Sequence, residues 1–99
     1  YMMEYQSKLQ DAQMDTLFDA ILCLKDREEC YRFFEDICTI NEIKSLAQRL
    51  EVAMMLRDKR TYHEIAEKTG ASTATISRVN RSLIYGADGY NRILDRLNK

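Results

Sequence analysis

A single glycine inside an otherwise helical pattern constrains this chain most. In the stretch "EIAEKTGASTATISRVNRSL", Gly70 separates two short amphipathic segments. Glycine readily takes the left-handed conformation that ends many helices, so a helix should end there and the chain should turn. Thr61 and Glu64 have the T-x-x-E spacing of a capping box and should open the first helix, while Ser72 should cap the second. The pattern predicts two short helices joined by a tight turn over residues 62–83.

The second of these helices begins with short side chains. Residues 72–75 read Ser-Thr-Ala-Thr, which a helix that mainly fills a core would not place in its first turn. A helix-turn-helix needs a small residue where its two helices cross, and apolar positions on the second helix that face back. Ala66, Ile76 and Val79 fit these positions. The segment therefore predicts a helix-turn-helix whose second helix approaches another molecule closely.

The side chains left on the outer face of this motif are candidates for binding double-stranded DNA. Small residues at a helix N-terminus let the backbone enter a major groove about 12 Å wide, and the free amides there attract phosphate. The candidate DNA-binding residues are Tyr62, His63, Ser72, Thr73, Ala74, Thr75, Ser77, Arg78 and Arg81. An ordinary helical hairpin with a glycine cap is the alternative structure. The alternative function is a helical protein-interaction adaptor that uses the motif as a docking surface.

Apolar residues at helical spacing run through the rest of the chain. One such stripe is formed by Met14, Leu17, Phe18, Ile21 and Leu22. Together the stripes predict six helices and no strand, with Asn41 as the cap of the third helix. We expect one all-α domain over residues 1–99. It should contain dimerisation helices in residues 1–38, a core helix plus the helix-turn-helix in residues 39–84, and a packing helix in residues 85–99.

The apolar stripes are wide for a chain of 99 residues with 45% hydrophobic residues. Met54, Met55 and Leu56 are consecutive, so the third helix should be apolar on more than one side. A monomer of this size would struggle to cover such faces, which favours a homodimer over a compact monomeric bundle. No apolar run approaches the roughly 18 residues of a membrane span, so no membrane partner is expected.

The two parts of the chain differ in charge. Residues 1–39 carry four Lys/Arg against nine Asp/Glu, and residues 40–99 carry eleven against seven. This asymmetry favours a polyanion as the partner of the C-terminal part. The sequence places no nucleophile beside a base, and His63 is its one histidine. We therefore expect no catalytic residue and no enzyme.

Three cysteines lie among apolar neighbours, at spacings of seven and eight residues. They are Cys23, Cys30 and Cys38. Zinc sites favour close pairs such as C-x2-C, so no metal site is expected. Buried, reduced thiols are the better interpretation, and they indicate a cytoplasmic protein.

Residues 39–83 resemble the Trp repressor family. The resemblance rests on "TINE", on the arginine after "LAQ", and on "GASTATISR" at the turn and second helix. The subgroup most similar in sequence is that of the Trp-repressor-related YerC/YecD proteins. This resemblance implies a six-helix Trp-repressor-like fold and an intertwined homodimer. The helix-turn-helix of each copy, residues 62–83, is called its reading head, and the two reading heads should face successive major grooves. The resemblance also implies a cytoplasmic bacterial transcription regulator, a repressor.

The resemblance also implies a candidate effector pocket. Tryptophan-responsive family members line a corepressor pocket with two arginines, which correspond by position to Arg49 and Arg78, with Thr39 near the same pocket. Arg49 has an alternative interpretation as the solvated side of a core helix. A glycine normally follows the second arginine and leaves room for the indole ring, but this chain has Val79 there. The branched side chain argues against tryptophan as the corepressor. We expect no cofactor, and the identity of any small-molecule effector stays open.

Overall fold

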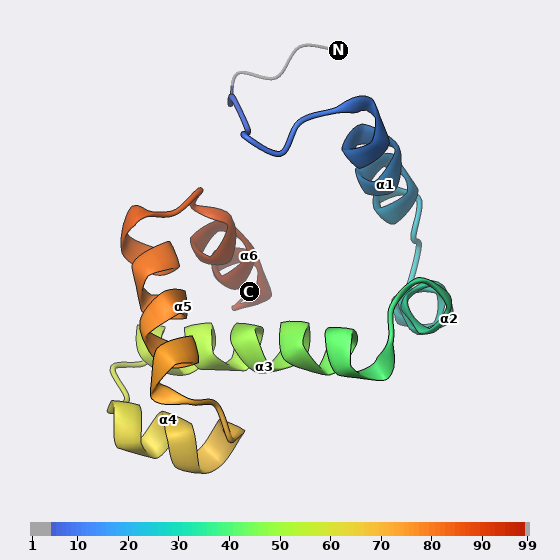
Figure 1. The fold of residues 1–99 in the computed structure, drawn as a ribbon. Helices are drawn as coiled ribbons and strands as arrows, with labels where there is room; N and C mark the ends of the chain where they lie inside the picture. Colours follow the sequence, from blue (N-terminus) through green and yellow to red (C-terminus); the bar gives the residue numbers. More distant parts are fainter. Residues whose placement is uncertain (1–4, 99) are drawn as a thin grey trace. The chain divides into compact units, whose positions relative to one another are not determined.

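The computed structural model describes residues 5–98, which form six α-helices and no strand, as predicted (Figure 1). The helices are α1 (Ala12–Leu22), α2 (Arg27–Ile37), α3 (Ile40–Arg57), α4 (Tyr62–Thr69), α5 (Thr73–Tyr85) and α6 (Gly89–Leu97). The chain divides into two compact units between Ile37 and Cys38. The first unit holds α1 and α2, and the second holds α3 to α6.

The first unit has no buried core of its own. The Asp11 carboxylate accepts a hydrogen bond from the backbone N–H of Met14 at 2.7 Å, which satisfies a free donor at the start of α1. Neither α1 nor α2 buries a residue, and Phe18 and Leu22 are 47% and 81% exposed. The apolar stripes predicted on these helices are therefore left largely uncovered within one chain.

Helix α3 begins earlier than predicted. Its N-cap is Thr39, so the assignment of this role to Asn41 is wrong. The Thr39 hydroxyl accepts from the backbone N–H of Glu42 at 3.1 Å, and the Glu42 carboxylate accepts from the backbone N–H of Thr39 at 2.8 Å. This capping box satisfies two donors, whereas an asparagine at position 41 would satisfy one, which explains why the helix starts at Ile40.

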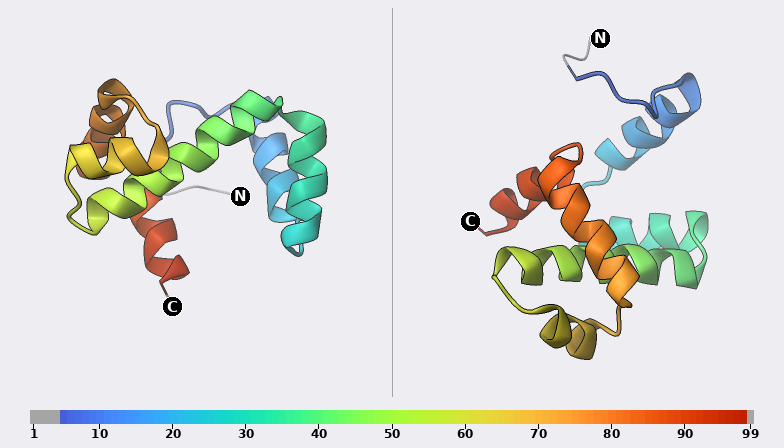
Figure 2. Two further views of the ribbon diagram at one scale, coloured as in Figure 1. Left: turned by 90° about the horizontal axis from the view of Figure 1, so that it is seen from below. Right: turned by 60° about the vertical axis from the view of Figure 1, so that its left-hand side comes forward.

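The second unit packs around α3. Helix α5 crosses α3, and α4 lies beside the C-terminal half of α3 (Figures 1 and 2). Helix α6 contacts both α3 and α5. The buried core consists of Val52, Ala53, Ile65, Ala71, Ile76, Val79 and Leu94. These residues come from α3, α4, α5, α6 and the turn after α4, so the same small core holds the helix-turn-helix and the last helix.

Polar contacts fix α6 to the end of α3. Arg57 donates to the backbone carbonyl of Asn91 at 3.1 Å and to the Asp95 carboxylate at 2.6 Å. The side-chain amide of Asn91 donates to the carbonyl of Leu83 at 3.1 Å. Between α5 and α6, a Cβ on Gly86 would lie 2.4 Å from the backbone oxygen of residue 82, so only glycine fits there. The last helix is thus tied to α3 through Arg57 and to α5 through Asn91.

The residue after the C-cap of α3 has a strained backbone conformation, which offers a stability test. Lys59 has a φ of 62°, in the left-handed region, and the N–H of Arg60 reaches back to the carbonyl of Met55 at 3.1 Å. Because glycine takes this conformation without penalty, Lys59→Gly should raise the free energy of unfolding by about 1 kcal/mol. Urea denaturation would measure the change. Lys59→Ala is the control, since it removes the charge but keeps the Cβ; an equal gain from both variants would contradict the conformational explanation.

Candidate nucleic-acid interface

The predicted capping box opens α4. The Thr61 hydroxyl accepts from the backbone N–H of Glu64 at 3.1 Å, and the Glu64 carboxylate accepts from the backbone N–H of Thr61 at 3.1 Å. Glu64 also pairs with Arg60 at 3.1 Å. The first helical turn carries Tyr62 and His63, and both side chains are exposed. The capping box therefore fixes where the outer face of the motif begins.

This capping box predicts that the stability of the folded chain depends on pH. The bond from the Thr61 backbone, helped by Arg60 and the Thr61 hydroxyl, lowers the pKa of Glu64 below its usual value. A lowered pKa in the folded state means that the carboxylate stabilises α4 above the pKa of an unfolded glutamate, about 4.3. That stability is lost as the pH falls through the lower, folded pKa.

Glu64→Gln should weaken this acid dependence, because the amide oxygen can still accept from Thr61 but does not titrate over this range. Thermal melts between pH 7 and pH 3 would measure it. Glu51→Gln on α3 is the control, since Glu51 makes no capping bond in the described chain. If both variants reduce the change in melting temperature between pH 7 and pH 3 equally, the capping bond is not its cause.

The turn after α4 is built around Gly70. Its φ of 74° confirms the predicted left-handed position, and its N–H donates to the carbonyl of Ala66 at 2.9 Å. Ala71 follows and is 5% exposed, so the turn is pinned into the core. Gln48 on α3 donates from its side chain to the carbonyl of Thr69 at 3.1 Å. Sequence reasoning missed this contact, because no spacing rule connects residues 21 positions apart.

Helix α5 starts where predicted, with Ser72 as its N-cap. The Ser72 hydroxyl accepts from the backbone N–H of Thr75 at 3.1 Å and donates to the Thr75 hydroxyl at 3.1 Å. Thr75 is partly buried, while Ser72, Thr73 and Ala74 are exposed. The first turn of α5 therefore presents backbone and short side chains to solvent.

The rest of α5 separates into two faces. Ile76 is fully buried and Val79 is 2% exposed, so these residues hold the helix on the core. Arg78 and Arg81 are exposed, and Ser77 is partly buried. Within residues 5–98 neither arginine has an ion-pair partner. Both arginines are thus free to meet an anion.

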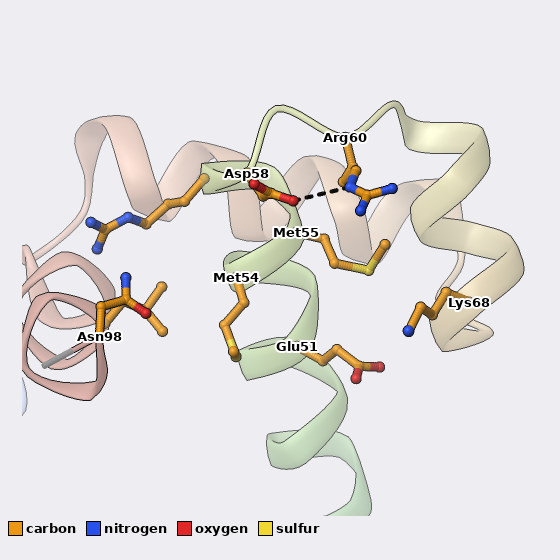
Figure 3. A pocket seen from close by; sticks show the side chains of 9 residues that line it. Glu51, Met54, Met55, Asp58, Arg60, Lys68 and Asn98 are labelled. Atoms are coloured by element: carbon orange, nitrogen blue, oxygen red, sulfur yellow. Dashed lines mark hydrogen bonds and ion pairs between the residues drawn. The ribbon is translucent and has the colours of Figure 1, made fainter.

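The four residues predicted for an effector pocket have different environments. Thr39 caps α3, Arg49 is exposed on α3, Arg78 is exposed on α5, and Val79 lies in the core. A hollow of about 540 Å³ lies elsewhere, between α3, the end of α4 and α6 (Figure 3). Its lining includes Glu51, Met54, Asp58, Lys68 and Asn98, and none of the four predicted residues.

The cysteines differ from their predicted environment. Cys23 is exposed, and Cys30 and Cys38 are partly buried, so the expectation of buried thiols is wrong for the single chain. The reason is that α1 and α2 build no core within one chain. Across residues 5–98 there is no cluster of His, Cys, Asp and Glu that could hold a metal ion. Nor does this part of the chain have a helix that meets the length and hydropathy of a membrane span.

Known proteins match this geometry and sequence. The family model described as Trp repressor protein matches residues 12–98. The uncharacterized protein YerC of Bacillus subtilis is 65% identical over 92 residues, which cover 93% of this chain and 88% of YerC.

Solved structures agree. A TrpR-like protein from Eubacterium eligens superposes with a TM-score of 0.89 at 68% identity, covering 92% of this chain and 94% of that one. A candidate Trp repressor from Staphylococcus aureus gives a TM-score of 0.88 at 62% identity, covering 92% and 91%. The resemblance found in "TINE" and "GASTATISR" is confirmed over nearly the whole sequence, and the chain belongs to the Trp repressor family.

Proposed function

We propose that this chain is a sequence-specific DNA-binding transcription regulator, a repressor in the bacterial cytoplasm. In this proposal α5 enters the major groove of double-stranded DNA. The observation that carries the proposal is the outer face of α5. Its first turn is short and exposed at Thr73 and Ala74, and Arg78 and Arg81 follow with no ion-pair partner in the described chain.

The chemistry of this face suits a nucleic acid. The short side chains allow the backbone of α5 to approach base edges, and hydroxyl and methyl groups such as those of Thr73 can hydrogen-bond to bases or contact the thymine methyl. The arginines, one turn or more further along, are suited to phosphate. Few direct base contacts are available, so bridging water and DNA shape should supply part of the specificity.

The form that binds DNA should be a homodimer. Large apolar side chains remain exposed on the first three helices: Phe18 (47%), Leu22 (81%), Ile37 (49%), Ile40 (72%) and Leu46 (47%). A second copy with the same faces could cover them, as expected for a symmetric pair. Two reading heads would then reach half-sites about 34 Å apart, on a nearly palindromic site.

Selection of bound sequences from a random DNA pool tests the proposal. A regulator of this kind should enrich one nearly palindromic sequence with half-sites one helical turn apart. A protein-interaction adaptor would enrich none. Failure to enrich any sequence at low salt would overturn the proposed function.

The two kinds of side chain on α5 should respond differently to mutation. Arg81→Ala should weaken binding to all duplexes alike. It should also reduce the slope of log affinity against log salt by roughly one unit per reading head. Thr73→Val should instead change the preferred base, at a cost on the order of 1–3 kcal/mol. Fluorescence anisotropy on the selected site and its point variants would measure both.

Arg96→Ala is the charge-matched control, since Arg96 is exposed on α6 outside the motif. It should leave both the salt dependence and the base preference unchanged. A changed base preference in Arg81→Ala with an intact salt dependence would reverse the assignment of contacts.

A further inference from the structure

One hydrogen bond ties the helix-turn-helix to α3. Gln48 lies partly buried on α3, and its Nε2 donates to the carbonyl of Thr69 at 3.1 Å. Among the side-chain hydrogen bonds of residues 5–98, no other joins α3 to residues 62–83. The apolar core also joins α3 to this segment.

Thr69 makes hydrogen bonds to three parts of the chain. Its hydroxyl donates to the carbonyl of Ile65 at 2.7 Å and accepts from the N–H of Ala71 at 3.1 Å. One residue therefore joins the last turn of α4, the start of the turn and, through its carbonyl, α3. Ser72, the cap of α5, lies three residues further along the chain. Any shift of Thr69 would be transmitted over this short distance to the first turn of α5.

The apolar core alone would not fix the direction of α5. Ile65, Ile76 and Val79 are buried, but apolar contacts are non-directional and tolerate small rotations. A hydrogen bond is directional and weakens steeply with misalignment. Reading base edges requires that α5 be held to well under 1 Å, which a directional contact supports better than apolar packing.

We propose that Gln48 is a positioning residue that orients α5 for sequence-specific DNA reading through its bond to the Thr69 carbonyl. This inference rests on the proposed function. Both groups of the bond belong to this chain.

Hydrogen exchange tests the bond without DNA. The amides of Gly70 and Ala71 are both hydrogen-bonded in the turn and should be protected. Gln48→Leu keeps the size of the side chain and removes the donor. It should lower the protection factors of these two amides roughly five- to tenfold, which corresponds to the loss of one hydrogen bond. Asn41→Leu, at an exposed amide in the first turn of α3, is the control and should leave them unchanged. Unchanged protection in Gln48→Leu would overturn the proposal.

DNA selectivity tests the positioning role. At a temperature well below the melting transition, Gln48→Leu should lower the ratio of affinities for the selected site and a scrambled duplex roughly five- to tenfold. Simple unfolding would lower both affinities together and leave the ratio unchanged. Gln48→Glu keeps the shape but has no N–H to donate, so it should lose at least as much selectivity as Gln48→Leu; retained selectivity there would overturn the role of the hydrogen bond. If the wild-type protein bound no DNA, the proposed function would fail, while the exchange experiment would still decide whether Gln48 holds the turn.

Discussion

Replacing Val79 with glycine should lower the free energy of unfolding by about 3 kcal/mol. The Val79 side chain is 2% exposed and packs in the core with Val52, Ala53 and Ile76. Full burial of such a side chain contributes roughly 1.5–3 kcal/mol. Glycine in a helix interior costs about another 1 kcal/mol relative to alanine.

Urea denaturation would measure this loss. Ala74→Gly is the matched control, because residue 74 is exposed in the same helix and loses helix propensity without losing buried surface. Its cost should stay at or below about 1 kcal/mol. Equal losses from the two variants would show that Val79 contributes nothing through packing.

Val79 also affects whether tryptophan can act as the effector. Tryptophan-responsive family members are expected to have glycine where this chain has Val79, and here the valine side chain itself fills space in the core. Tryptophan should therefore leave the melting temperature and DNA affinity of the wild-type protein unchanged. A true ligand at a hundredfold excess over its Kd would stabilise the protein by about 2.7 kcal/mol, which a thermal melt detects easily. A tryptophan-dependent shift would overturn this interpretation of Val79.

The helix-turn-helix was predictable because its determinants are local. The T-x-x-E spacing, Gly70 and Ser72 each fix the backbone within one turn of themselves, and all three took the predicted roles. The burial of Ile76 and Val79 followed from their helical spacing. Patterns that act within four residues do not need the rest of the fold.

Other features depended on contacts that a sequence pattern does not encode. Asn41 is a good cap on local grounds, but Thr39 with Glu42 forms the more complete capping box. Cys23 has apolar neighbours in sequence yet is exposed, because α1 builds no core within one chain. The Gln48 bond depends on how α4 packs against α3, so only the folded arrangement brings it out.

Binding to the selected DNA site should weaken roughly 150-fold between 50 and 200 mM salt, because each neutralised phosphate adds about −0.9 to the slope of log affinity against log salt. Arg78 and Arg81 are exposed, and within residues 5–98 neither is engaged by a carboxylate. A dimer brings four such arginines to the duplex, which gives a slope of about −3.6.

Fluorescence anisotropy over a salt series would measure this slope, and a duplex carrying one half-site serves as the control. A single reading head engages two arginines, so the half-site slope should be about −1.8, with roughly a twelvefold loss over the same range. The comparison thereby counts reading heads as well as phosphate contacts. Equal slopes on the full site and the half-site would contradict the paired arrangement. A slope near zero on both would indicate that α5 does not meet phosphate, and would favour the protein-interaction adaptor instead.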